Sequence, residues 1–143
     1  MKKLNFDSQR EFLPTFAELI DAFSINQIKE IRLSNKESYA KEMNRISNDI
    51  NLFINEKGIR LSARLIRLVI IIAQMNLSIW DNKDKMQQNP KKYDELLKLA
   101  HQLNGIRNKI KNILLEESGE KEPSKKRTNT QTDDLKGWDI SID

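Results

Sequence analysis

The sequence contains no cysteine. Disulfides, thiolate nucleophiles and zinc sites built on sulfur are therefore excluded. Only four glycines and three prolines occur in 143 residues, and this scarcity favours long helices. His101 is the only histidine, and the chain has neither a glycine-rich phosphate loop nor a nucleophile elbow. The sequence thus carries no specific catalytic motif.

The charge balance argues against nucleic-acid binding. Lysine and arginine number 25 and aspartate and glutamate 21, which gives a formal charge of +4. Charges of both signs alternate along most of the chain, far from the dense basic surface of a nucleic-acid-binding protein. The N-terminus turns polar before an apolar stretch of signal-peptide length can form, so we expect a cytoplasmic protein. This length suits one domain with a sufficient core.

Capping and breaking signals divide most of the chain into four helices. Thr15 and Glu18 form a capping box at the start of the first helix. Gly58 ends the second helix, since glycine adopts the left-handed conformation without strain. Pro90, capped by Asn89, separates the third helix from the fourth. The predicted helices are 15–32, 35–57, 60–88 and 90–117.

The third predicted helix is apolar almost all the way round between residues 65 and 73. A single stripe of contacts cannot cover such a helix, so we expect several neighbours to surround it. Three arginines interrupt it, and we expect it to be too short to span a bilayer. Short loops between the helices predict antiparallel neighbours. The predicted fold is all-α: an antiparallel up-down-up-down four-helix bundle at 15–117 with a long central third helix.

The ends of the chain differ from the bundle. Residues 1–14 are predicted to form an N-terminal arm, and residues 118–143 a polar, largely disordered tail. The end of the tail is apolar at alternate positions, which is typical of an extended segment that docks on a surface. That surface is either the chain's own bundle or a partner. The docking residues are Trp138, Ile140 and Ile142.

Polar residues interrupt the apolar faces of the last two helices. Asn76, Trp80 and Asp84 are four residues apart and share one face of the third helix. Arg107 borders the leucine stripe of the fourth helix, where a guanidinium needs a partner such as Asp84 or Asp21. One interpretation is a cleft that binds an anion, and the other is a buried network that fixes helix register. The fourth-helix strip contains His101, Asn104, Arg107, Asn108 and Lys111.

Two further features carry weaker hypotheses. No serine or acid stands at a helical spacing that would orient His101 as a general base, and its neighbours are poor metal ligands. We therefore expect no metal and no cofactor. Arg60, Arg64 and Arg67 form a basic stripe that either contacts phosphate, an acidic partner or a membrane headgroup, or is simply solvated and paired with nearby acids.

Segments 18–29, 76–84 and 103–108 resemble a group of small, uncharacterised all-helical bacterial proteins. Members of that group are often encoded beside glycosyltransferases in surface-polysaccharide clusters. The sequence departs from the group where two adjacent acids would follow Trp80, because Asp81 and Asp84 are separated here. The resemblance implies one polar cluster between the first, third and fourth helices. Its members would be Asp21, Lys29, Asn76, Trp80, Asp84, Asn104, Arg107 and Asn108.

Two functional hypotheses follow. The first is a helical interaction or accessory protein, a homodimer or the partner of a sugar-transferring system. The alternative is a small enzyme or ligand-binding protein that takes a phosphorylated or nucleotide-sugar ligand in the cleft around Arg107.

Overall fold

The computed structural model describes residues 13–120, 137–138 and 140–142. Within these residues the protein is all-α, with four α-helices, a short 3-10 turn and no strand. Most of the predicted arm at 1–14 and of the predicted tail at 118–143 lies outside the described residues. The elements are α1 Phe16–Arg32, α2 Lys36–Lys57, α3 Ala63–Gln88, η1 Pro90–Lys92 and α4 Tyr93–Glu117.

Local capping sets where the helices begin and end. The Thr15 hydroxyl accepts a hydrogen bond from the Glu18 amide at 3.1 Å, as the capping box predicted. The Ser62 hydroxyl accepts a hydrogen bond from the Leu65 amide at 3.0 Å and caps α3. Helix α3 therefore begins at Ala63, three residues later than predicted. Gly58 follows α2 with φ 62°, the left-handed conformation that glycine adopts without strain.

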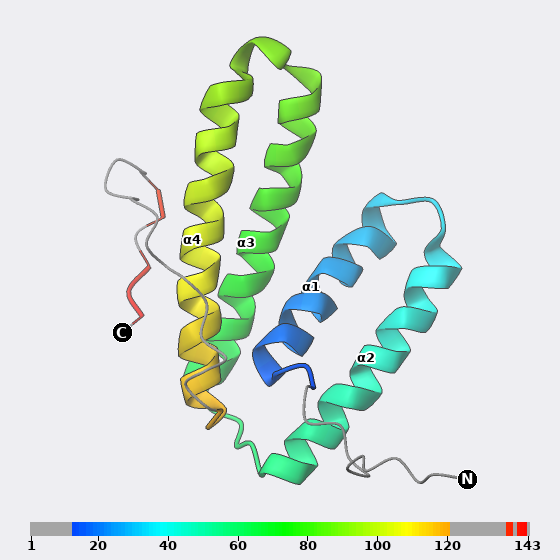
Figure 1. Ribbon diagram of the computed structural model, residues 1–143. Helices are drawn as coiled ribbons and strands as arrows, with labels where there is room; N and C mark the ends of the chain where they lie inside the picture. Colours follow the sequence, from blue (N-terminus) through cyan, green and yellow to red (C-terminus); the bar gives the residue numbers. More distant parts are fainter. Residues whose placement is uncertain (1–12, 121–136, 139, 143) are drawn as a thin grey trace, which may run out of the picture.

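The four helices form two antiparallel hairpins, and the chain direction alternates from each helix to the next (Figure 1). Helix α3 packs along α4, and α1 packs along α2. Helix α1 also contacts both α3 and α4, so it lies between α2 and the α3–α4 hairpin. Helix α2 packs principally on α1 and leans away from α3. The helices therefore form a three-helix core of α1, α3 and α4, with α2 on its outer side.

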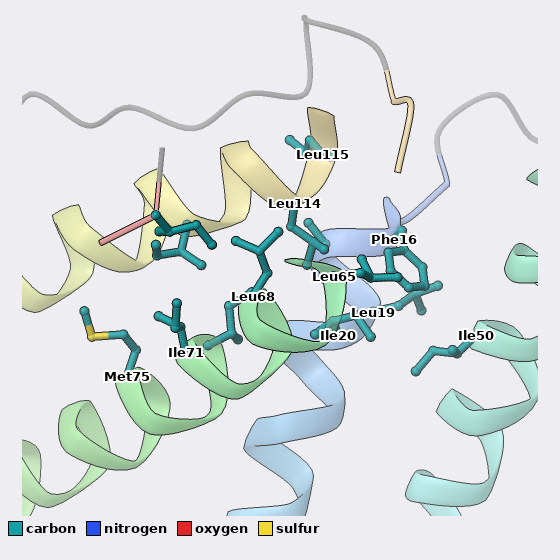
Figure 2. Packing of buried hydrophobic residues seen from close by; sticks show 14 of the residues in the cluster. Phe16, Leu19, Ile20, Ile50, Leu65, Leu68, Ile71, Met75, Leu114 and Leu115 are labelled. Carbon is teal, nitrogen blue, oxygen red and sulfur yellow. The ribbon is translucent and has the colours of Figure 1, made fainter. Parts of the chain in front are cut away.

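The core lies where α3, α4 and the first turns of α1 meet (Figure 2). Leu68 and Ile72 of α3 and Leu114 of α4 are completely buried. Helix α2 reaches this core through Ile50 and through Phe53, whose ring centre lies 5.6 Å from that of Phe16. Burial of such side chains typically stabilises a fold by about 2 kcal/mol each.

Helix α3 is buried on one face only, which corrects the prediction that neighbours surround it. Ile66, Ile70 and Leu77 are 45%, 52% and 38% exposed on its outer side. The reason is that α2 packs principally on α1, and the described residues Trp138 and Ile140 border Ile70 and Leu77 without covering them. The prediction that α3 is too short for a bilayer is also wrong, since its 26 residues are long and apolar enough by length and composition. Its inner face nevertheless packs as a core helix, with Met75 fully buried.

A single carboxylate joins the start of α1 to the end of α4. Gly119 ends α4 with φ 76°, and the Glu120 amide bonds back to the Leu115 carbonyl at 2.9 Å. This turn carries the Glu120 side chain to α1, where Oε1 accepts a hydrogen bond from the Phe16 amide at 2.8 Å. Burial raises the pKa of Glu120, although hydrogen bonds from Ser118 and from the amides of α1 oppose the rise.

Candidate functional site

Six polar side chains from three helices meet between α1, α3 and α4. We call this group the Asp21 cluster. Asp21 lies at its centre and is only 6% exposed, because it projects from the inner face of α1. The members are Asp21, Ser24, Asn76, Asn104, Arg107 and Lys111.

The Asp21 carboxylate accepts hydrogen bonds from both neighbouring helices. The Arg107 guanidinium binds it at two points, with Nε 3.0 Å from Oδ1 and Nη2 donating to Oδ2. Lys111 Nζ lies 3.2 Å from Oδ2. Asn76 Nδ2 of α3 donates to Oδ1 at 2.8 Å and to the Ser24 hydroxyl at 2.6 Å. One carboxylate therefore fixes α1 against both α3 and α4.

The cluster carries two positive charges and one negative charge. Burial by itself raises the pKa of Asp21. Hydrogen bonds from Arg107 and Asn76, together with the charges of Arg107 and Lys111, outweigh burial and lower the pKa below the ordinary value of 3.8. Arg107 Nη1 also donates to Asn104 Oδ1 at 3.3 Å. The guanidinium is thus largely occupied by partners from the chain itself, which suits a network that fixes helix register.

Several predicted site residues lie elsewhere. Asp84 and His101 are exposed, and Trp80 is half-buried on α3. Lys29 lies over the Tyr39 ring at 6.0 Å, between α1 and α2 and away from the Asp21 cluster. Asn108 is half-buried on α4 and has a polar partner.

Sequence reasoning did not place Ser24 or Asn82 in a polar contact between helices. Ser24 stands one turn after Asp21, and that spacing was a usable signal. Asn82 is 3% exposed, and its amide donates to the Leu96 carbonyl of α4 at 2.9 Å. Asn82 stands three residues after Ile79, which belongs to the apolar face of α3. This helical spacing would have indicated that the Asn82 side chain also points into the core.

An apolar groove opens where the two hairpins diverge. We call it the helix groove. Its cavity volume is about 420 Å³, and its walls come from α1, α2 and α3. The ion pair between Arg32 and Asp81, with 3.1 Å between nitrogen and oxygen, bridges α1 and α3 beside it. The apolar lining consists of Ile20, Phe23, Ile28, Ile31, Met43, Val69, Ala73 and Leu77, and the polar lining of Ser24, Gln27 and Arg32.

The C-terminal docking residues lie against the chain's own helices. Ile142 is 4% exposed within the core, and Trp138 and Ile140 pack partly buried beside it. Arg67 of α3 holds this segment, with Nη1 2.9 Å from the Ser141 carbonyl and Nη2 2.9 Å from its hydroxyl. The segment therefore covers one flank of α3, whereas the helix groove lies on the other flank.

The basic stripe is partly engaged within the chain. Arg64 pairs with Glu117 of α4 at 3.2 Å, and Arg67 binds Ser141 as described above. In the part of the chain that the structure describes, no group of three or more His, Asp or Glu side chains is placed to hold a metal ion. Comparisons of this chain with protein-family models, with curated proteins and with solved structures found no match.

Proposed function

We propose that this protein is a non-enzymatic interaction module that binds an amphipathic helix in the helix groove. The observation that carries the proposal is a groove of about 420 Å³ with almost wholly apolar walls, continuous with exposed apolar residues of α3. Monomeric proteins rarely leave such a surface uncovered. Recognition of a helix by an apolar groove uses anchors at helical spacing, and the apolar residues along the α1 wall of this groove offer matching positions.

The resemblance to proteins encoded beside glycosyltransferases suggests the system in which the protein acts. We propose a cytoplasmic accessory role in assembling a bacterial surface polysaccharide. The support is the shared pattern of Asn76, Trp80 and the segment 103–108. In this role the Asp21 cluster orients the helices, so that the groove keeps its shape.

The alternative, a small enzyme or a binding protein for a nucleotide sugar, has less physical support. An anionic ligand at Arg107 would have to displace Asp21, which already occupies two of the guanidinium donors. It would also have to leave a buried carboxylate beside a second anion, and like charges in a buried site repel strongly.

Peptide binding tests the proposed function. A panel of fluorescently labelled amphipathic helical peptides, including a copy of residues 60–86, is titrated with wild-type protein and read by anisotropy. Ala73 lies in the wall of the helix groove, so Ala73→Arg should block the groove and weaken binding at least about tenfold. Ala63→Arg makes the same change at an exposed position at the start of α3 and should bind as wild type does. If wild type is a monomer and no peptide binds, or if both variants bind alike, the interaction function is refuted.

A further inference from the structure

We propose that the helix bound in the groove is α3 of a second copy of this chain, so that two copies pair through antiparallel α3 helices. The inference rests on the proposed function and deepens it by naming the partner. The surface in question combines the helix groove with the outer face of α3. Both features belong to the same side of one molecule, since Ala73 and Leu77 take part in each.

The outer face of α3 carries a seam at coiled-coil spacing. Ile66, Ile70, Ala73 and Leu77 follow one another at steps of four, three and four. The three large side chains of this seam are among the exposed apolar residues of the structure. Helix α3 thus presents to solvent the pattern that another helix normally covers, and Ala73 allows a close approach near its middle.

The spacing of the seam residues is the same in both chain directions. This symmetry favours pairing of the seam with an antiparallel second copy. Turning α3 about a two-fold axis between residues 71 and 72 places Ile66 level with Leu77 of the second copy. It likewise places Ile70 level with Ala73, a large residue against a small one in both halves. A two-fold interface uses one patch twice, so a surface that pairs with itself must have this symmetry.

The groove and the seam have matching lengths. The α1 wall of the groove runs from Ile20 to Ile31, and the seam runs from Ile66 to Leu77. Each interval is eleven residues of helix, or about 17 Å. The seam of one copy therefore fits along the groove of the other, where it covers the exposed Ile31 side chain as well.

Charge at the ends of α3 agrees with the antiparallel direction. Asp84 is exposed and continues the line of the seam beyond Leu77, towards the C-terminal end of α3. In the two-fold arrangement it lies just beyond Ala63, the first residue of α3 in the second copy, and so faces the amino end of the partner helix and the segment that carries the exposed Arg60. Both features favour a carboxylate. A parallel pair would instead set the two Asp84 carboxylates side by side.

Nearly half of the large hydrophobic side chains that are exposed in the described residues belong to this one surface. Ile31, Ile66, Ile70 and Leu77 are four of the nine large hydrophobic side chains exposed there. Pairing covers all four in each copy. The covered surface draws on α1, α2 and α3, which makes it broader than one helix face, and a stable interface typically buries about 800 Å² per partner.

Sedimentation equilibrium at about 10 to 100 µM protein tests the pairing. Wild type should be a dimer. Ile70→Glu should raise the dissociation constant at least about 100-fold, because the substitution enters the interface twice and buries two carboxylates. Leu52→Glu is the matched control, since Leu52 is 50% exposed on α2 and Ile70 is 52% exposed on α3. The control should remain a dimer, and circular dichroism should show both variants folded.

The distance between spin labels on the two copies tests whether their α3 helices run antiparallel. The chain has no cysteine, so Lys85→Cys provides a single labelling position on the exposed side of α3. Antiparallel helices centred between residues 71 and 72 place the two labels about 40 Å apart, whereas parallel helices place them about 10 Å apart. A short distance would overturn the antiparallel arrangement.

The two proposals fail in different ways. If wild type is a monomer across this range while a peptide other than the 60–86 copy binds the groove, self-pairing is refuted and the interaction function stands. If wild type is a monomer and no peptide binds, both are refuted. A dimer that both Ile70→Glu and Leu52→Glu leave unchanged pairs through another surface and also refutes the inference.

Discussion

Replacing Asp21 by asparagine should destabilise the protein more than any surface substitution. The Asp21, Arg107 and Lys111 side chains are only 9%, 21% and 8% exposed, so their charges cannot simply be solvated in place. Asp21→Asn keeps the size and removes the only negative charge of the cluster. Loss of one partner of a buried ion pair typically costs about 3 to 5 kcal/mol of unfolding free energy. Because Arg107 reaches solvent at its edge, we expect about 3 kcal/mol.

A double-mutant cycle with Lys111 separates charge from packing. Lys111→Met alone should cost less than about 1 kcal/mol, since Asp21 keeps its two bonds to Arg107. Combined with Asp21→Asn it removes one of the two cations that have lost the Asp21 carboxylate. The double variant should therefore be at least about 1 kcal/mol more stable than the sum of the single effects indicates.

Urea denaturation followed by circular dichroism gives these unfolding free energies. Their dependence on pH shows whether the lost stability comes from the charge of Asp21. The folded-state pKa of Asp21 lies below 3.8, so its stabilising effect is complete above pH 3.8 and is lost as the pH falls towards the lowered pKa. The difference between wild type and Asp21→Asn should be constant above pH 3.8 and should shrink below it. A loss under about 1 kcal/mol at neutral pH would show that the cluster does not hold the helices together.

Three further predictions concern other parts of the molecule. Glu120→Ala should cost about 1 kcal/mol of unfolding free energy, because the Phe16 amide loses its acceptor; equal stability by urea denaturation would contradict this role. Ile142→Asp should cost about 3 kcal/mol, since this side chain is 4% exposed in the core, whereas Ser141→Ala should cost under about 1 kcal/mol in the same assay. A panel of nucleotide sugars should not raise the melting temperature; a rise that Arg107→Ala abolishes would favour the ligand-binding alternative.

Part of the Asp21 cluster followed from sequence reasoning alone. Arg107 stands on the border of an apolar stripe, and a guanidinium at that place needs an acceptor, so Asp21 and Asp84 were named as candidate partners. The structure selects Asp21, because α1 packs into the angle between α3 and α4. Asp84 shares a face with Trp80 but lies near the end of α3, beyond the reach of the cluster. Helical spacing assigns residues to a face, and it does not say which neighbour covers that face.

The sequence by itself determined the helices and their order. Thr15 starts α1 and Gly58 ends α2 through contacts within a few residues, and such local chemistry is the same in any fold. Pro90 opens a 3-10 turn without a side-chain cap from Asn89, so α4 begins at Tyr93, three residues later than predicted. The tertiary structure alone decided how much of α3 is covered. Residues 65–73 are apolar enough for burial on all sides, yet α2 packs on α1 and leaves Ile70 exposed. Each apolar face can be buried against more than one neighbour, and the choice depends on the packing of the whole chain.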